Sequence, residues 1–365
     1  MRKDTIKHLK MEFKRDSTMN KIFAIVMLPL LLGGVIACTD VQGDGMGTVI
    51  WQGSTVPQDS SFRNPVWEPD LSYSAVYKAA VGYYAIGADN EWSPGLELTT
   101  PVLSSTDLMS WDQRGEALAE KPAWSENFIS AVSAGFAKTK GTYYLFYELG
   151  NDGIGMGSSK APQGPFTDYG LLINAESAGL EKCTKPFFYA FGSKSYLFYQ
   201  GGDGVYGQEL ILNKTGLALL KGEKFKVTGP SIESMNMLKL DDYYYLFGAV
   251  EDGDASRLTL GRAPEVSGPF LDQEGNSLLS GEGTLLLKGD AANGFVAVNH
   301  IAGILEDSND DIWVAHQATD VDMPALSSGA ARHPLVITRI ELDDSGWPTQ
   351  VFEATKGWNY PKFIK

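Results

Sequence analysis

Short aromatic and apolar runs, each introduced by a turn residue, recur along the chain. They begin at residues 82, 141, 194, 242 and 311, as in Gly141-Thr-Tyr-Tyr-Leu-Phe-Tyr and Asp242-Tyr-Tyr-Tyr-Leu-Phe. A run that stays apolar on both faces predicts a strand buried on both sides. Successive runs start 59, 53, 48 and 69 residues apart. This spacing is too long for a simple solenoid and suits units of about four strands.

A second element follows several of these runs. It consists of a strand, a short turn and a closing proline or tryptophan, at residues 103–111, 156–166 and 260–270. The chain also has 40 glycines and few helical periodicities. Together these patterns predict an all-β fold, a five-bladed β-propeller over residues 62–365. A β-sandwich with incidental Tyr-Tyr strands is the alternative.

The segment before the fourth run contains one carboxylate among small and apolar residues. Glu233 lies in Ser231-Ile-Glu-Ser-Met-Asn-Met-Leu, which leads into that aromatic strand. Burying an unpaired carboxylate is costly, so this position requires a partner or a function. Glu233 is therefore the first candidate site residue.

The N-terminal segment has the pattern of a secretory signal peptide. After Met19, which we take as the natural start, a basic residue is followed by an apolar stretch and small residues up to Cys38. Val35-Ile-Ala-Cys38 resembles a bacterial lipobox, which implies that Cys38 is the lipidated first residue of the mature protein. We therefore expect a signal peptide at 1–37 and a flexible tether at 38–61. The alternative is an uncleaved membrane anchor.

The charge balance restricts the partners. The chain has 30 basic and 45 acidic residues, a net charge of −15. This excludes nucleic acid as a default partner and predicts no basic face for anionic lipid, so the lipid anchor would be the only membrane contact. Apart from Cys38, Cys183 is the second of two cysteines, so no disulfide is expected once Cys38 is lipidated. We expect an exported monomer anchored to a bacterial membrane, at the outer membrane or cell surface.

From residue 62 the chain resembles glycoside hydrolase family 43. The similarity lies in Phe62-Arg-Asn-Pro-Val-Trp-Glu-Pro-Asp-Leu, Asn90-Glu-Trp-Ser-Pro-Gly, Asn299-His300, Arg332-His-Pro-Leu-Val and Gly346-Trp-Pro. The resemblance implies a five-bladed propeller, activity on arabinan or xylan, and no required cofactor. It also implies inverting hydrolysis, in which one carboxylate activates water and another protonates the leaving oxygen, ~6.5–9.5 Å apart. In the family a third carboxylate tunes the acid.

The chain departs from this family pattern at three positions. Tyr73 stands at the position of the base, Gly135 at an axial position of the second blade, and Lys185 at the position of the tuning acid. Only Glu233 is retained, as the candidate general acid. It either keeps that role or forms an ion pair with Lys185. Tyr73 either fills the space of the lost aspartate or offers a ring and hydroxyl to a sugar.

The remaining candidates each have two interpretations. His300 resembles the family's axial histidine, which implies a nearby water or a metal such as an axial Ca²⁺, or it is a core histidine. Trp92 and Trp124 lie in predicted loops, where they bind sugar by stacking or pack on a blade. Asp89 and Glu91 are candidate substitute acids because they lie near the predicted funnel mouth.

Three functions follow from these residues. The first is a lipoprotein that binds an oligo- or polysaccharide of plant type in the propeller funnel without cleaving it. The second is an active glycosidase that uses Glu233 with a displaced base such as Asp70. The third is sialidase-like chemistry with a tyrosine nucleophile, which requires an arginine cluster that the sequence lacks. We expect the first.

Overall fold

The structure is a computed structural model that describes residues 48–51, 54–57, 61–93, 95–351 and 354–359. The predicted signal peptide and Cys38 lie outside the described residues. Within the predicted tether, β1(Thr48–Trp51) and β2(Ser54–Pro57) pair as antiparallel strands. No helix among the described residues is long and apolar enough to cross a membrane.

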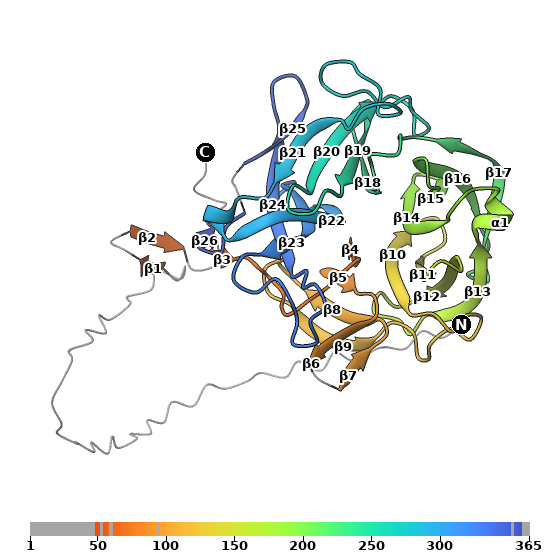
Figure 1. Cartoon of the computed structure of the whole chain (residues 1–365), viewed down its shortest axis with the longest axis horizontal. Helices are drawn as coiled ribbons and strands as arrows, with labels where there is room; N and C mark the ends of the chain where they lie inside the picture. The colour runs from red at the N-terminus through yellow and green to blue at the C-terminus, as the bar shows by residue number, and fades with distance from the viewer. Residues whose placement is uncertain (1–47, 52–53, 58–60, 94, 352–353, 360–365) are drawn as a thin grey trace, which may run out of the picture. The chain divides into compact units, whose positions relative to one another are not determined.

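The described part of the chain forms five four-stranded antiparallel sheets, each made of strands consecutive along the chain apart from one inserted hairpin. Figure 1 looks down the axis and shows the inner strands β4, β10, β14, β18 and β22 around the centre. This confirms the all-β prediction and the five-bladed propeller. The blades comprise β4(Ala75–Lys78), β5(Tyr83–Ile86), β8(Pro101–Ser105) and β9(Asp112–Glu116); β10(Ile129–Ala137), β11(Thr142–Leu149), β12(Ile154–Ser159) and β13(Thr167–Ile173); β14(Thr184–Phe191), β15(Lys194–Gln200), β16(Val205–Leu212) and β17(Ala218–Lys226); β18(Ser234–Leu240), β19(Tyr243–Val250), β20(Arg257–Ala263) and β21(Thr284–Lys288); and β22(Phe295–Glu306), β23(Ile312–Asp320), β24(Leu335–Leu342) and β25(Pro348–Gln350).

The aromatic runs are the second strands of the blades, and each contributes to two cores. In β11, Tyr144 and Phe146 pack with Phe188 of the third blade, whereas Leu145 and Tyr147 pack in the core shared with the first blade. Successive side chains of a strand point to opposite faces, so a strand between two neighbouring blades must be apolar on both. The five main hydrophobic clusters of the described residues follow this arrangement, one at each junction between blades.

The ring closes between the last and the first blade without a shared strand. The Asn64 side chain both donates to the Ile337 carbonyl and accepts from its amide, at 3.0 Å each. The ring of Phe62 packs edge-on against Trp313 of β23 at 6.0 Å. In addition, β3(Phe62–Arg63) pairs with β26(Trp358–Asn359). Contacts from before the first blade therefore hold the fifth blade in place.

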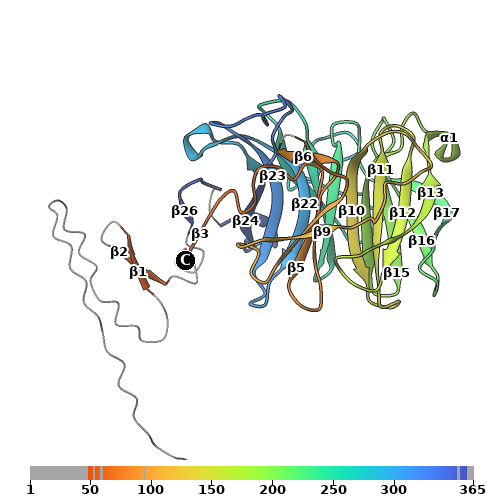
Figure 2. The same cartoon turned by 90° about the horizontal axis from the view of Figure 1, so that it is seen from below.

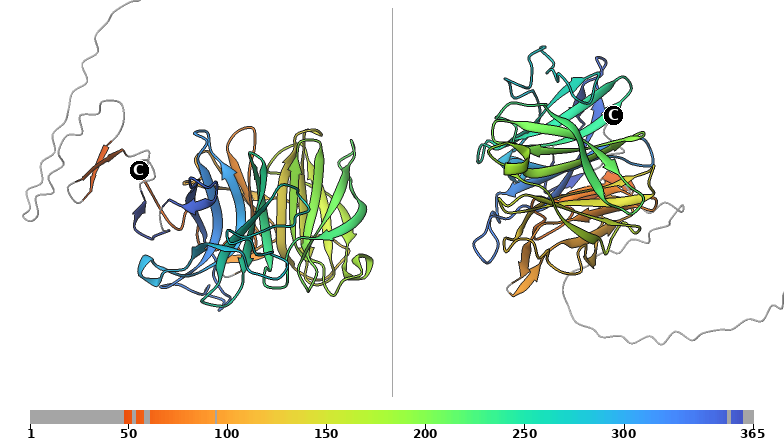
Figure 3. Two further views of the ribbon diagram at one scale, coloured as in Figure 1. Left: turned by 90° about the horizontal axis from the view of Figure 1, so that it is seen from above. Right: turned by 90° about the vertical axis from the view of Figure 1, so that its right-hand side faces the viewer.

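Few described elements fall outside the blades. The hairpin β6(Asn90–Ser93) and β7(Leu96–Leu98) is inserted in the first blade, and the helices are α1(Ala175–Ala178) and the 3-10 turn η2(Ala291–Asn293). Figure 2 and Figure 3 show the propeller from the side, with connecting loops and turns at the two ends of the blades. Cys183 is a buried free thiol whose pKa burial raises to about 12, so it is unreactive at neutral pH.

Candidate functional site

Cross-strand register shows which inner-strand residues are equivalent at one end of the axis. The same position of the aromatic run pairs with the inner strand in three blades: Ala75 with Ile86, Ser133 with Phe146, and Phe187 with Phe198. Two residues earlier along the chain stand Tyr73, Ala131 and Lys185, and these three residues line one cavity. We call this end of the propeller, where Tyr73, Lys185 and Glu233 lie, the funnel end.

Tyr73 and Lys185 share an uncommon backbone conformation. Both have left-handed φ values, 44° and 51°. For residues other than glycine this conformation costs about 1–3 kcal/mol, and aspartate tolerates it better than tyrosine or lysine. The backbone at these two positions thus suits the aspartates that the family resemblance implies there.

Side chains from the preceding blade hold these two positions. The Tyr73 amide donates to Gln317 Oε1 at 3.2 Å, and the Lys185 amide donates to Glu148 Oε2 at 2.6 Å. Similarly, Gln200 Nε2 donates to the Ile232 carbonyl at 3.0 Å, beside Glu233. Sequence reasoning missed these bridges. Their signal is a polar side chain six or seven positions after the start of the aromatic run.

A cluster of ion pairs joins the charged groups of the funnel end. The Lys185 ammonium lies 2.6 Å from Glu251 Oε1 and 3.5 Å from Glu233 Oε2, and Lys182 Nζ lies 3.6 Å from Glu233 Oε2. Burial alone would lower the pKa of Lys185, but the charges of Glu251, Tyr73 and Glu233 raise it overall. Lys185 therefore stays protonated, and its closest carboxylate is Glu251, which the sequence did not single out.

The side chain of Tyr73 lies between Lys185 and His300. Lys185 Nζ is 5.7 Å from the centre of the phenol ring, and the His300 ring is 5.4 Å away on a tilted plane. Burial, followed by the charge of Glu251, raises the pKa of Tyr73. The phenol is therefore neutral near pH 7 and cannot accept a proton as a carboxylate does.

Two cavities flank Tyr73. One of about 300 Å³ lies towards His300, Gln317 and Glu251. The other, of about 370 Å³, lies towards Asp89, Glu148 and Lys185. In the second cavity, Asp89 Oδ1 is buried without a hydrogen-bond partner, and burial raises the pKa of this carboxyl to about 6. Burial also raises the pKa of Glu148.

Comparison with known proteins explains this architecture. The model of the family described as "Glycosyl hydrolases family 43" matches residues 62–348. The chain belongs to this family. It is 25% identical over 283 residues to an extracellular endo-α-(1→5)-L-arabinanase of Bacillus subtilis, covering 68% of this chain and 84% of the relative. An extracellular exo-α-(1→5)-L-arabinofuranosidase of Cellvibrio japonicus is 25% identical over 289 residues, covering 68% and 79%.

Solved structures of family 43 show the same fold. An α-L-arabinanase of Cellvibrio cellulosa in complex with arabinohexaose has a TM-score of 0.63 at 21% identity, covering 78% of this chain and 96% of that chain. An exo-1,5-α-L-arabinanase from a bovine ruminal metagenomic library also has a TM-score of 0.63, at 18% identity, covering 79% and 99%. At these identities the comparison shows a shared propeller fold.

Other predicted residues of this family member lie away from Tyr73. Gly135 is four residues beyond Ala131 along β10 and lines a different cavity, together with Phe136 and Phe187. Gly135 lies six residues before the start of its aromatic run, whereas Tyr73 and Lys185 lie nine residues before theirs. The structure thus places Ala131, rather than Gly135, level with Tyr73 and Lys185.

The two candidate tryptophans pack on their blades. Trp92 lies in β6 rather than in a loop, its ring is 5.2 Å from that of Trp67, and its buried Nε1 has no partner. The Trp124 indole donates to the Tyr147 hydroxyl at 2.9 Å and packs against the core between the first two blades. Neither lines the cavities beside Tyr73. Their contacts correspond to the packing alternative.

The carboxylate of Asp70, the candidate displaced base, accepts several hydrogen bonds from its neighbours. It is 2% exposed and accepts from the amide and hydroxyl of Ser72 at 3.0 Å each, and from the His333 amide. Because these donors surround the carboxylate, it fixes the entry of the first blade and is not directed at either cavity beside Tyr73.

Family 43 enzymes need no cofactor, and the surroundings of His300 do not suit calcium. Burial lowers the pKa of His300 to about 3, so the ring is neutral, and Nδ1 lies 3.2 Å from Ser234 Oγ. Calcium requires several oxygen ligands, most of them carboxylate or carbonyl. Here the Lys185 charge itself contributes to lowering the pKa of His300. Among the described residues no group of three or more His, Cys, Asp or Glu side chains is arranged for a metal.

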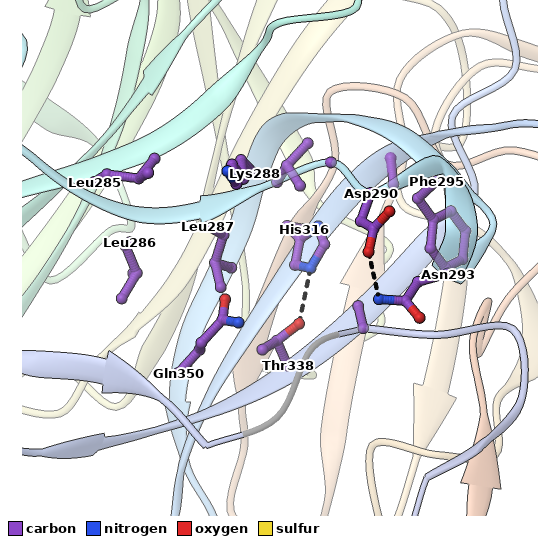
Figure 4. Close-up of a pocket in the computed structure, with 14 residues that line it drawn as sticks. Leu285, Leu286, Leu287, Lys288, Asp290, Asn293, Phe295, His316, Thr338 and Gln350 are labelled. Carbon is purple, nitrogen blue, oxygen red and sulfur yellow. Dashed lines mark hydrogen bonds between the residues drawn. The ribbon is translucent and has the colours of Figure 1, made fainter.

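A further cavity lies elsewhere. About 480 Å³ is enclosed between β21 and the fifth blade, lined by Leu285, Leu287, Asp290 and His316 among others (Figure 4). His316 lies 3.1 Å from Thr338 Oγ1, and burial lowers its pKa to about 4. It is thus a neutral, hydrogen-bonded core histidine, and this cavity contains none of the funnel-end groups.

Proposed function

We propose that this family 43 member binds a plant-type glycan, of arabinan or xylan type, at the funnel end without hydrolysing it efficiently. The relatives support the ligand class. Two are named for activity on α-1,5-linked arabinan, and one similar structure contains arabinohexaose. The two cavities beside Tyr73 offer an aromatic ring with amide, hydroxyl and carboxyl groups, which is the mixture that binds a sugar ring and its hydroxyls.

The contact between Lys185 and Glu233 carries the proposal. Inverting hydrolysis requires two carboxyl groups about 6.5–9.5 Å apart with water between them. Here a neutral phenol occupies the base position, and an ammonium occupies the position of the tuning acid, 3.5 Å from the one retained carboxylate. Loss of a general base typically reduces the rate by about 10²–10⁴-fold. Glu233 is held between Lys182 and Lys185, which favours an ion-pair role.

Binding and cleavage are measured on the same samples. Calorimetry with arabino- and xylo-oligosaccharides should show binding, whereas reducing-sugar release and hydrolysis of aryl arabinofuranosides and xylosides should remain at background. The Glu233→Gln variant is the control. Turnover by the unmodified protein that disappears in this variant would show that Glu233 works as an acid, and the proposal would be wrong.

We further propose that the protein is exported and anchored by lipid at Cys38. Its relatives include extracellular glycosidases, and the lipobox-like sequence supports acylation. Cys38→Ala should move the protein from the membrane fraction to the soluble fraction, as measured by fractionation and immunoblotting. Unchanged partitioning of the variant would refute lipid anchoring.

One observation favours hydrolysis by displaced carboxyl groups as a second candidate. Asp89 has an unpartnered buried oxygen and a pKa raised by burial to about 6, and it shares a cavity with Glu148. A carboxyl group with such a pKa can exchange protons near neutral pH. In this case turnover would be abolished by Asp89→Asn and retained in Glu233→Gln, which distinguishes the two candidates.

A further inference from the structure

The inner strands of the five blades line one cavity along the axis. This axial cavity has a volume of about 290 Å³ and is lined by residues on or beside β4, β10, β14, β18 and β22, the strands that Figure 1 shows around the centre. It reaches from Ser74 and His300 at the funnel end to Lys78, Phe136 and Glu306 near the other ends of these strands. At ~30 Å³ for each water, the cavity has room for about ten waters, and so for one small ring.

Aromatic side chains gather where this cavity reaches the far ends of the inner strands. We call this end of the propeller the turn end, because the inner strands turn there into the second strands. Phe136 and Tyr189 line the cavity. The ring of Tyr189 lies 6.4 Å from that of Phe191 with the planes 2° apart, and Tyr244 stands edge-on to both. Phe136 is 38% exposed and Phe191 is 47% exposed, so both rings can cover the apolar face of a ligand.

Tyr189 gives an independent indication of a ligand. Its side chain is 9% exposed, and its hydroxyl is buried without a hydrogen-bond partner in the described part of the chain. A buried hydroxyl without a partner destabilises the folded state, and such groups are rare in folded proteins. A ligand hydroxyl that entered the axial cavity and bonded Tyr189 would remove this penalty.

The charges of the turn end do not favour a ligand of either sign. The turns between first and second strands, with the strand ends beside them, carry Lys78, Lys138, Lys140, Lys194 and Lys239 together with Asp241, Asp242, Glu306, Asp307, Asp310 and Asp311. Lys78 donates to the carbonyls of Glu306 and Asp307. Lys239 donates to the carbonyl of Asp241. A ligand with hydroxyl groups and no net charge can bond both kinds of group, whereas an ionic ligand would be repelled by one of them.

We propose that the turn end is a second carbohydrate site, for a neutral oligosaccharide whose terminal sugar enters the axial cavity. The Tyr189 hydroxyl bonds a hydroxyl of that sugar, and the rings of Phe136 and Phe191 contact the C–H faces. A purely apolar ligand would leave the Tyr189 hydroxyl without a partner. The site lies at the opposite end of the axis from Tyr73 and does not depend on the proposed function.

The test uses xylotetraose as the neutral probe, with binding measured by titration calorimetry. The protein is the full chain with Cys38→Ala, so that no lipid anchor interferes. Xylotetraose should bind, and because it is uncharged its affinity should stay constant as salt rises. An affinity that falls steeply with salt would show that ionic contacts dominate and would contradict the proposal.

Two tyrosine variants test the buried hydroxyl. Tyr189→Phe should weaken xylotetraose binding about threefold to tenfold, because one hydrogen bond to the sugar is lost. It should also raise the melting temperature, because the folded protein no longer buries an unpaired hydroxyl. Tyr144→Phe is the matched control: its hydroxyl is also buried without a partner, but it lies in the core between the second and third blades and does not line the axial cavity. This control should raise the melting temperature and leave binding unchanged.

A second pair of variants tests the exposed ring. Phe191→Ala should weaken xylotetraose binding about twofold to tenfold, because the sugar loses an apolar surface. Leu219→Ala is its control, because this side chain is 49% exposed but lies on the outer strand β17. Tyr73→Ala, at the funnel end, should leave binding at the turn end unchanged.

Three outcomes overturn the proposal. Xylotetraose that does not bind at all would show that the turn end is not a site for neutral sugars. Equal affinities of the unmodified protein and Tyr189→Phe, or equal weakening by Tyr144→Phe, would show that the Tyr189 hydroxyl does not contact the ligand. If Tyr73→Ala abolished binding and the turn-end variants had no effect, xylotetraose would bind at the funnel end alone, and the proposed function would survive while this inference failed.

Discussion

The charged side chains at the two ends of the propeller axis differ in whether they form ion pairs. At the funnel end, Lys185 is 16% exposed and contacts Glu251 and Glu233. At the opposite end, where the inner strands turn into the second strands, Lys194 is exposed beside Phe191 and forms no ion pair with a described carboxylate. Burial explains the difference, because a buried ammonium requires compensating carboxylates whereas a solvated one does not. The ion pairs of the funnel end therefore follow from burial, and an exposed lysine needs none.

The largest expected effect comes from restoring acids at the funnel end. In Tyr73→Asp combined with Lys185→Asp, a base would return and one of the two cations beside Glu233 would be removed. The left-handed backbone at both positions suits aspartate. We expect hydrolysis of aryl arabinofuranosides to rise by about 10²-fold or more over the unmodified protein. Tyr73→Asp alone should not restore it, since Lys185 would still contact Glu233. Equal rates for the single and double variants would contradict the ion-pair explanation.

Replacing one lysine at each end tests the comparison directly. Lys185→Met should lower the free energy of unfolding by about 3 kcal/mol, because it leaves two partly buried carboxylates without their shared cation. Lys194→Met should change it by less than about 0.5 kcal/mol, as expected for a surface residue. Urea denaturation followed by tryptophan fluorescence measures both. Similar values for the two variants would show that the funnel-end pairs contribute no more than surface charges.

The two carboxylates that contact Lys185 should contribute different amounts to the free energy of unfolding. Glu251 lies 2.6 Å from the ammonium and Glu233 lies 3.5 Å away. Both side chains are about one-third exposed, so we expect a loss of about 1–2 kcal/mol for Glu251→Gln and less for Glu233→Gln. The same denaturation assay ranks them. The reverse order would make Glu233 the principal partner of Lys185.

The smallest expected effect is a pH dependence at Asp89. Burial raises the pKa of this carboxyl to about 6 from an ordinary value of 3.8, so between these values the folded state binds more protons than the unfolded state. Stability contributed at this position therefore falls as pH rises from about 4 to 6. Asp89→Asn should raise the melting temperature at pH 7 and leave it nearly unchanged at pH 4. A larger gain at pH 4 would contradict the assigned cause.

The sequence by itself determined the propeller, the number of blades and the family. Aromatic runs that are apolar on both faces predicted strands buried on both sides, and five such runs predicted five blades. The positions of Tyr73 and Lys185 could also be read from the sequence, because each lies nine residues before the start of its run. Gly135 lies only six residues before its run, and the structure places it in a different cavity.

Only the tertiary structure decided what the replaced residues touch. Glu251 follows the last residue of β19, and Lys185 is the second residue of β14. They nevertheless form the shortest ion pair of the site. The packing of Trp92 and Trp124 and the enclosure of Asp70 likewise depend on how blades meet around the axis. Contacts between blades join residues about 50 to 260 positions apart, and no local pattern of polar and apolar residues encodes which of them meet.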